Sequence, residues 1–150
     1  MNSPSEKKEI KVHISFNNGE DTGPVKGEFL WAEPLGDNRA RIANIPFFAE
    51  SLNHQDIVSY LPGKINEIVG VVELGGHQTV DMLFADNAPV AKVLEELGGK
   101  FPSIGTEGIG GGIVVMDLPP DVDHEAIFTA LNTLADDGIL EAFGLRGNPQ

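Results

Sequence analysis

The first half of the chain alternates apolar and polar residues with a period of two, which predicts strands with one buried face. The alternation is clearest where Ile10, Val12, Ile14 and Phe16 share one side of a strand. Segments rich in Gly, Asn and Pro then separate four further predicted strands, at residues 28–35, 39–43, 56–61 and 65–74. Five short strands in so short a stretch predict a small, strongly bent sheet or an SH3-like barrel.

The second half mixes strands with helices. Residues 77–84 alternate as a strand, and two later segments repeat apolar residues at helical spacing. We expect the first helix to begin at Asn87 as N-cap and to end at Gly98 and Gly99, and the second to follow Pro119 and Pro120. Short strands are expected at 101–104, 113–118 and 139–143. The resulting order, β-α-β-β-α-β, is typical of a ferredoxin-like fold.

These patterns together predict the fold class and its division along the chain. We expect an α+β protein in which a flexible N-terminus at residues 1–9 precedes a small β-barrel-like sheet at 10–74. A ferredoxin-like unit at 75–146 follows. A chain of 150 residues can bury a sizeable core, so the two parts are expected to pack as one compact protein.

Net charge narrows the choice of partner. Ten Lys and Arg against 23 Asp and Glu leave a net charge of −13, which opposes binding to nucleic acid or to an anionic membrane surface. The excess is concentrated in residues 75–150, where three cations face twelve carboxylates. Such a field raises association rates with a basic partner by about 10 to 1,000-fold. We therefore expect a basic protein partner, such as a toxin domain.

Seven acidic residues belong to the two predicted helices or to their ends, and the helices of a ferredoxin-like fold cover the same face of the sheet. They could therefore form one acidic surface, or they could be an ordinary solvated helix face. The candidate partner-binding residues are Glu95, Glu96, Asp121, Asp123, Glu125, Asp136 and Asp137.

Motifs for catalysis, metals and cofactors do not match. The chain has no Cys, which excludes disulfides and thiolate chemistry. The glycine-rich residues 105–112 run into a strand rather than opening a helix, so they predict a flexible hairpin instead of a phosphate loop. The acidic run around His124 fits helix capping better than any metal motif. No Ser lies in a nucleophile elbow. We expect no catalytic residue, metal or cofactor.

Two further features concern the core and the compartment. Trp31 is the only Trp, and its position beside Leu30 favours the core of the small sheet over an exposed anchor. The polar start of the chain lacks an apolar signal segment, and no window approaches the roughly 18 apolar residues of a membrane span. A cytoplasmic protein is expected.

Several strings resemble a known family. They are residues 30–36 (LWAEPLG), 44–49 (NIPFFA), 56–58 (DIV), 76–80 (GHQTV) and 117–120 (DLPP), together with Phe84. They resemble an uncharacterised bacterial family catalogued as domain of unknown function 4265. The resemblance covers most of the chain and implies a bacterial protein, but it brings no activity and no catalytic residues. Asp81 departs from the pattern, which implies a basic residue there.

Compact acidic bacterial proteins of this size also resemble, in general character, immunity proteins that neutralise toxin domains. Our leading hypothesis is a non-enzymatic protein-binding module, of the immunity type, that inhibits a basic toxin domain such as a nuclease. A small-molecule-binding regulatory domain, with residues 105–112 as an adjustable loop, is the alternative. An enzyme with an unrecognised site is a third.

Overall fold

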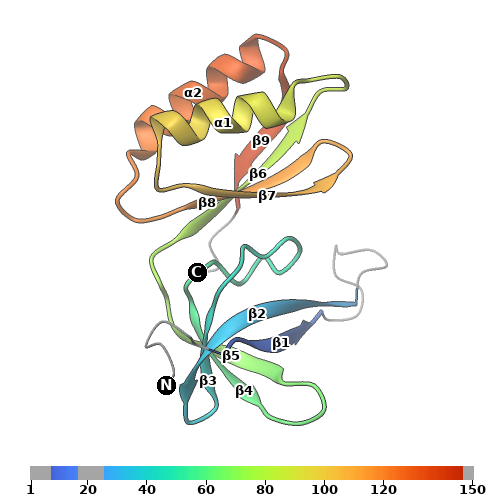
Figure 1. Ribbon diagram of the computed structural model, residues 1–150, viewed down its shortest axis with the longest axis vertical. Coiled ribbons are helices and arrows are strands. Elements are labelled where there is room, and N and C mark those ends of the chain that lie inside the picture. The colour runs from blue at the N-terminus through green and yellow to red at the C-terminus, as the bar shows by residue number, and fades with distance from the viewer. Residues whose placement is uncertain (1–7, 17–25, 147–150) are drawn as a thin grey trace, which may run out of the picture. The chain divides into compact units, whose positions relative to one another are not determined.

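The structure is a computed structural model that describes residues 8–16 and 26–146 (Figure 1). The chain divides into two compact units, residues 1–76 and residues 77–150. The expected flexible N-terminus, residues 1–9, lies mostly outside the described residues. The elements are β1 (Ile10–Ser15), β2 (Gly27–Gly36), β3 (Arg39–Ile42), β4 (Ile57–Leu61), β5 (Glu67–Glu73), β6 (Gln78–Phe84), α1 (Val90–Lys100), β7 (Gly105–Gly110), β8 (Ile113–Leu118), α2 (His124–Asp136) and β9 (Leu140–Leu145).

The first unit is a closed barrel of five strands in the order β1-β2-β3-β4-β5, which confirms the predicted barrel-like sheet. Successive strands pair antiparallel, and the barrel closes where β1 meets β5 in parallel. Because side chains alternate across each strand, one residue in two points inward. The most deeply buried side chains of these strands are Val12, Leu30, Ala32, Ala40, Ile42 and Val58.

Trp31 lies outside this core, so the prediction that it is buried was wrong: its side chain is 46% exposed. On β2 the parity of the strand places Leu30 and Ala32 inward, and therefore turns Trp31 and its neighbour Phe29 outward. A narrow five-stranded barrel has room for Ala and Leu at these positions, whereas Trp and Phe would overfill it.

The junction between β1 and β5 depends on side chains, because the two strands share a single residue pair, His13 and Glu67. The carboxylate of Glu67 lies 2.8 Å from Nδ1 of His13 and accepts a backbone N–H from Ser15 at 3.0 Å. The side chain of Asn66 donates to the carbonyl of Lys11 at 2.9 Å. These contacts supply the hydrogen bonds that a longer ladder would otherwise provide.

The pKa of Glu67 is lowered below its usual value by these contacts. Burial is the largest single contribution and opposes the shift, because it disfavours the charged carboxylate. The hydrogen bonds from His13 and Ser15, together with the charge of His13, outweigh it. The charged form of Glu67 therefore stabilises the closed barrel.

The second unit is a four-stranded sheet in the order β7-β8-β6-β9, with every neighbouring pair antiparallel. Both helices lie side by side on one face of this sheet (Figure 1). β6 directs Val80, Met82 and Phe84 into the core, where Ile127 and Leu131 of α2 join them. The protein is therefore an α+β chain with a closed barrel in one unit and a sheet with two helices in the other.

α1 differs from its predicted boundaries at both ends. Asn87 is not the N-cap, because it adopts a left-handed conformation (φ 66°) within a turn, and the helix begins after Pro89. Gly98 and Gly99 lie inside the last turn, which continues to Lys100. Helical packing of Val93 and Leu97 against the sheet overrides the low helix propensity of the two glycines.

Of the described residues, none belongs to a helix that is both long enough and apolar enough to cross a membrane.

The strand predicted at 101–104 was also wrong. These residues form turns that follow α1, in which Phe101 donates to the carbonyl of Leu97 and Ile104 to that of Phe101. The strand is the glycine-rich segment itself, β7, which pairs with β8 as a hairpin. Its turn uses positive φ angles of 91°, 66° and 79° at Gly110, Gly111 and Gly112, so the glycines serve the backbone of the hairpin.

Replacement of Gly112 by Ala tests this reading of the glycine-rich segment. An added Cβ would lie 2.9 Å from the carbonyl oxygen of Phe84 on a backbone of positive φ. We expect Gly112→Ala to lower the free energy of unfolding by about 1–3 kcal/mol, as measured by urea denaturation. Gly98→Ala is the control, because a Cβ there meets nothing and helical Ala is favoured over Gly by about 0.5–1 kcal/mol. Equal effects of both variants would contradict the conformational explanation.

Removal of the Glu67 charge tests the barrel junction. Because its pKa is lowered by folding, the unfolded chain binds the proton more readily, and the carboxylate stabilises the fold above the ordinary Glu pKa of about 4.3. This contribution disappears as pH falls through the lowered pKa. Glu67→Gln should therefore lose up to about 1 kcal/mol at pH 7 and nothing at acid pH, measured as the difference from the parent chain. Glu73→Gln, an exposed change on the same strand, should show no such difference.

Candidate functional site

The carboxylates of this acidic chain fall into two groups, and the first is bound within the fold. Glu28 accepts backbone N–H groups from Phe47, Phe48 and Ala49 at 2.8 to 3.0 Å, which holds the loop after β3. The buried Asp56 accepts from the backbone of Asn53 and Gly75, both at 2.9 Å. These acids accept hydrogen bonds from the N–H groups of loop residues, so their role is structural.

Two acids of the second unit are fixed by cationic or imidazole partners. Asp81 on β6 receives both arms of the buried Arg146 guanidinium, at 2.6 and 3.2 Å. Asp81, the acid that departs from the family pattern, is therefore the carboxylate partner of Arg146. The buried Asp117 on β8 holds Nδ1 of His77 at 2.9 and 3.0 Å from its two oxygens, which fixes the orientation of the imidazole.

The second group contains the seven predicted partner-binding acids, all of which are exposed. Within residues 8–16 and 26–146, none of them forms an ion pair. The structure places them at three locations on the helical layer. Glu95 and Glu96 lie in the middle of α1, whereas Asp121, Asp123 and Glu125 precede or begin α2, and Asp136 and Asp137 end it.

The acids that begin α2 have a structural role, as the capping interpretation predicts. Asp123 is the N-cap, and its carboxylate accepts the backbone N–H of Ala126 at 3.1 Å. Glu125 lies in the first turn. Negative charge here interacts favourably with the positive end of the helix dipole and with its free N–H groups. Asp123 and Glu125 therefore need no partner protein to account for their presence.

The acids that end α2 interact unfavourably with the helix dipole. Asp136 and Asp137 lie where the dipole is negative, and the last turn contains no basic residue. Each such charge costs stability, by roughly 0.3–1 kcal/mol in exposed positions. The C-terminus of α2 is capped without the side chains of these acids. Gly138 adopts a φ of 76°, and Ile139 donates its N–H to the carbonyl of Leu134 at 2.9 Å. Stability of the fold therefore does not explain these two acids.

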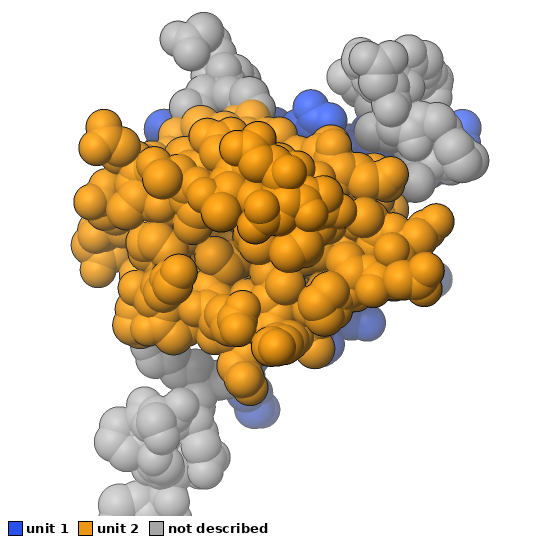
Figure 2. All heavy atoms as spheres, turned by 90° about the horizontal axis from the view of Figure 1, so that it is seen from above, with its two compact units in different colours: residues 1–76 blue, residues 77–150 orange. Residues whose placement is uncertain are grey.

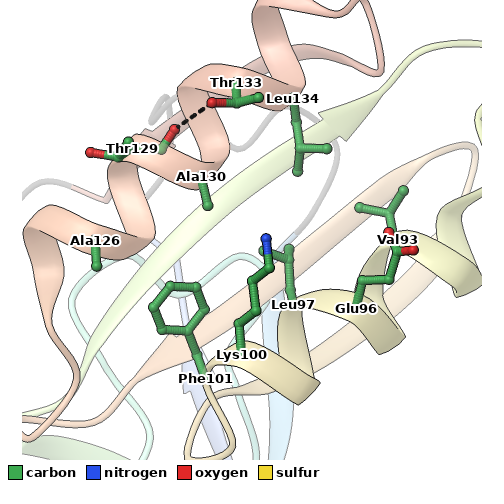
Figure 3. A pocket seen from close by; sticks show the side chains of 10 residues that line it. All are labelled: Val93, Glu96, Leu97, Lys100, Phe101, Ala126, Thr129, Ala130, Thr133 and Leu134. Atoms are coloured by element: carbon green, nitrogen blue, oxygen red, sulfur yellow. Dashed lines mark hydrogen bonds between the residues drawn. The ribbon is translucent and has the colours of Figure 1, made fainter.

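A groove of about 370 Å³ separates the two helices (Figure 3). The end of α1 faces the start of α2, so the helices run antiparallel along it. Apart from Leu134, its α2 wall consists of small side chains at helical spacing, namely Ala126, Thr129, Ala130 and Thr133. Small residues on one wall leave a space that the larger residues of α1 do not fill. That volume is at the lower end of the range for ligand sites in proteins.

The groove is apolar inside and polar at its rim. Val93 and Leu97 are buried at its base, and Phe101 and Leu134 add apolar surface. The hydroxyl groups of its two Thr residues donate to backbone carbonyls one turn earlier in α2, at 2.9 and 3.1 Å, so they are already used within the helix. The charged side chains in its lining are Glu96 and Lys100. Figure 2 looks onto this helical layer, whose surface is hollowed near its centre.

The outer wall of the barrel carries an aromatic surface that the sequence interpretation missed. Phe29 is 54% exposed beside Trp31, and the ammonium group of Lys11 lies 5.3 Å from the centre of the Trp31 ring. The ring of His13 packs on Phe29 at 4.5 Å. The strand alternation was the available signal, since it places Phe29 and Trp31 on one face of β2 and Leu30 and Ala32 on the other.

The groove was missed for a related reason. The large apolar residues of α2 mark its core face, whereas Ala126 and Ala130 form a second stripe of small residues beside that face. Their spacing of four residues was a usable signal. Only the antiparallel position of α1 shows that the stripe faces a neighbour that does not fill it.

Comparison with known proteins gives a family and a fold. The model of a family described as "Domain of unknown function (DUF4265)" matches residues 28–142, which confirms the resemblance. A solved structure described as the novel crystal structure of a hypothetical protein from Neisseria gonorrhoeae is similar, with a TM-score of 0.73 and 20% sequence identity. The match covers 93% of this chain and 94% of that chain, and at this identity it shows the fold alone. No curated protein matches significantly.

Charge removal at the two ends of α2 tests the division of its acids. Asp123→Ala should lower the free energy of unfolding by about 0.5–2 kcal/mol, because it leaves the first turn uncapped. Asp136→Asn should raise it by about 0.3–1 kcal/mol, because it removes a charge that opposes the dipole. Urea denaturation at low salt measures both. A destabilising Asp136→Asn would show that this acid serves the fold.

Proposed function

We propose that this chain, which belongs to the DUF4265 family, is a non-enzymatic protein-binding module that docks on a basic partner through the helical layer of its second unit. In this proposal the partner is a toxin domain, such as a nuclease, and the chain is its immunity-type inhibitor. A basic substrate-binding surface is a complementary target for an acidic inhibitor, because charge complementarity accelerates encounter and sets the docking register.

The observation that carries the proposal is the pair Asp136 and Asp137. Two exposed carboxylates at the negative end of a helix weaken the fold, and no cation among the described residues offsets them. Functional surfaces commonly retain groups that cost stability, because a partner supplies the missing interaction. A basic partner would supply it here.

The balance of charge in the second unit supports the same reading. Of its three cations, Arg146 is buried against Asp81 and contributes little positive field outside. Lys92 and Lys100 remain exposed, against seven exposed acids on or beside the helices. A cationic surface approaching this layer therefore meets net negative charge.

We further propose that the second unit has the ferredoxin-like fold predicted from the sequence. The chain order β6-α1-β7-β8-α2-β9, the sheet order β7-β8-β6-β9 and the antiparallel pairing support it. In such a fold the two helices form one continuous layer. That layer is the surface to which the proposed partner binds.

Charge reversal on this layer tests the proposed function against basic proteins encoded beside the gene for this chain. Binding of a true partner, measured by calorimetry, should weaken strongly between about 0.05 and 0.3 M salt, because screening shortens the range of the field. The double variant Asp136→Lys/Asp137→Lys should weaken binding by more than about tenfold.

The matched control reverses two exposed acids of the first unit. Glu50→Lys/Glu73→Lys makes the same change in net charge and should leave the affinity within about threefold of the parent. Binding that is insensitive to salt, or that both double variants weaken equally, would refute docking through the helical layer.

A further inference from the structure

We propose that the groove between α1 and α2 receives the apolar face of a basic amphipathic helix from the partner. This inference rests on the proposed function, which it makes more specific: charge brings the partner to the helical layer, and the groove anchors it. The site is distinct from the acids themselves, because apolar side chains form most of its lining.

The form of the groove favours a helix as its occupant. Its α2 wall repeats small residues at positions 126, 129, 130 and 133, so an incoming backbone can approach closely along the length of the groove. The antiparallel walls of α1 and α2 present ridges between which a third helix packs. Apolar residues spaced three and four apart on that helix would fill the space over Val93, Leu97 and Leu134.

The charges around the groove favour a basic occupant. Acids lie beyond both of its ends, with Asp121, Asp123 and Glu125 at the start of α2 and Asp136 and Asp137 at its finish. Glu96 lies between these ends in the wall formed by α1. Lys or Arg residues flanking the apolar face of the incoming helix would meet these carboxylates. Lys100 is the one cation in the lining, and Glu96 in the same wall offsets its charge.

A synthetic peptide of Lys and Leu, about 18 residues long and with Leu on one helical face, is the probe. A peptide of the same composition in scrambled order has the same charge and no apolar face. We expect the amphipathic peptide to bind the full chain and to shift the NMR signals of Ala126, Ala130 and Thr133 in a saturable manner. The scrambled peptide should bind at least about tenfold more weakly.

Two variants fill the groove without changing charge. Ala130→Phe and, at the exposed rim, Thr133→Phe should each weaken the amphipathic peptide by about tenfold, and thermal melting verifies that they fold. Asn132→Phe is the control, because this exposed residue of α2 lies outside the lining. It should leave the affinity unchanged.

The outcomes separate this inference from the proposed function. If Asp136→Lys/Asp137→Lys weakens the peptide but the groove-filling variants do not, the groove is not the anchor and docking by charge stands. Equal affinity for the amphipathic and the scrambled peptide would also show that the groove is not the anchor. If decanol binds in the groove and the peptide does not, the site takes a small apolar ligand instead. A dimer of this chain that Ala130→Phe dissociates would assign the groove to a second copy. Each of these results overturns the inference.

Discussion

Backbone N–H groups outside helices and strands need acceptors, and in this protein carboxylates provide many of them. Glu28 holds the loop that follows β3, Asp56 joins two loops of the first unit, and Glu67 closes the barrel where β1 and β5 share one residue pair. An unpaired buried N–H costs about 1–3 kcal/mol, so Glu28 and Asp56 stabilise the loops that they hold. Part of the strong negative charge therefore has a structural cause that composition alone does not show.

The acids of α2 differ in their effect on stability according to which end of the helix they occupy. Asp123 stabilises the start of the helix, whereas Asp136 and Asp137 destabilise its end, although all three are exposed carboxylates of one element. Interaction with the helix dipole thus separates acids that stabilise the fold from acids that destabilise it. The two at the end lie beside a groove with a largely apolar lining, and this combination of charge and apolar surface underlies the proposed docking of a basic helix.

Local sequence patterns predicted most elements, and they failed where tertiary packing overrode the local preference of Asn or Gly. The strands of the barrel and the apolar face of α2 follow from periodicity, because burial on one side imposes that period. Asn87 is a residue type that favours helix caps, yet in the fold it forms a left-handed turn before α1. Gly98 and Gly99 continue α1 because the helix packs against the sheet. The glycines of β7 pair as a strand since β8 offers them a ladder, despite their low strand propensity.

Composition and local periodicity are enough to identify an α+β chain with a barrel-like first part and a strongly acidic second part, and short sequence motifs identify its family. The fold is needed to show that Trp31 lies on the outer face of β2, and that α1 runs antiparallel beside the small residues of α2 to form the groove. Both features have one cause. Which face of an element is buried, and what it lies against, is set by partners distant in the sequence.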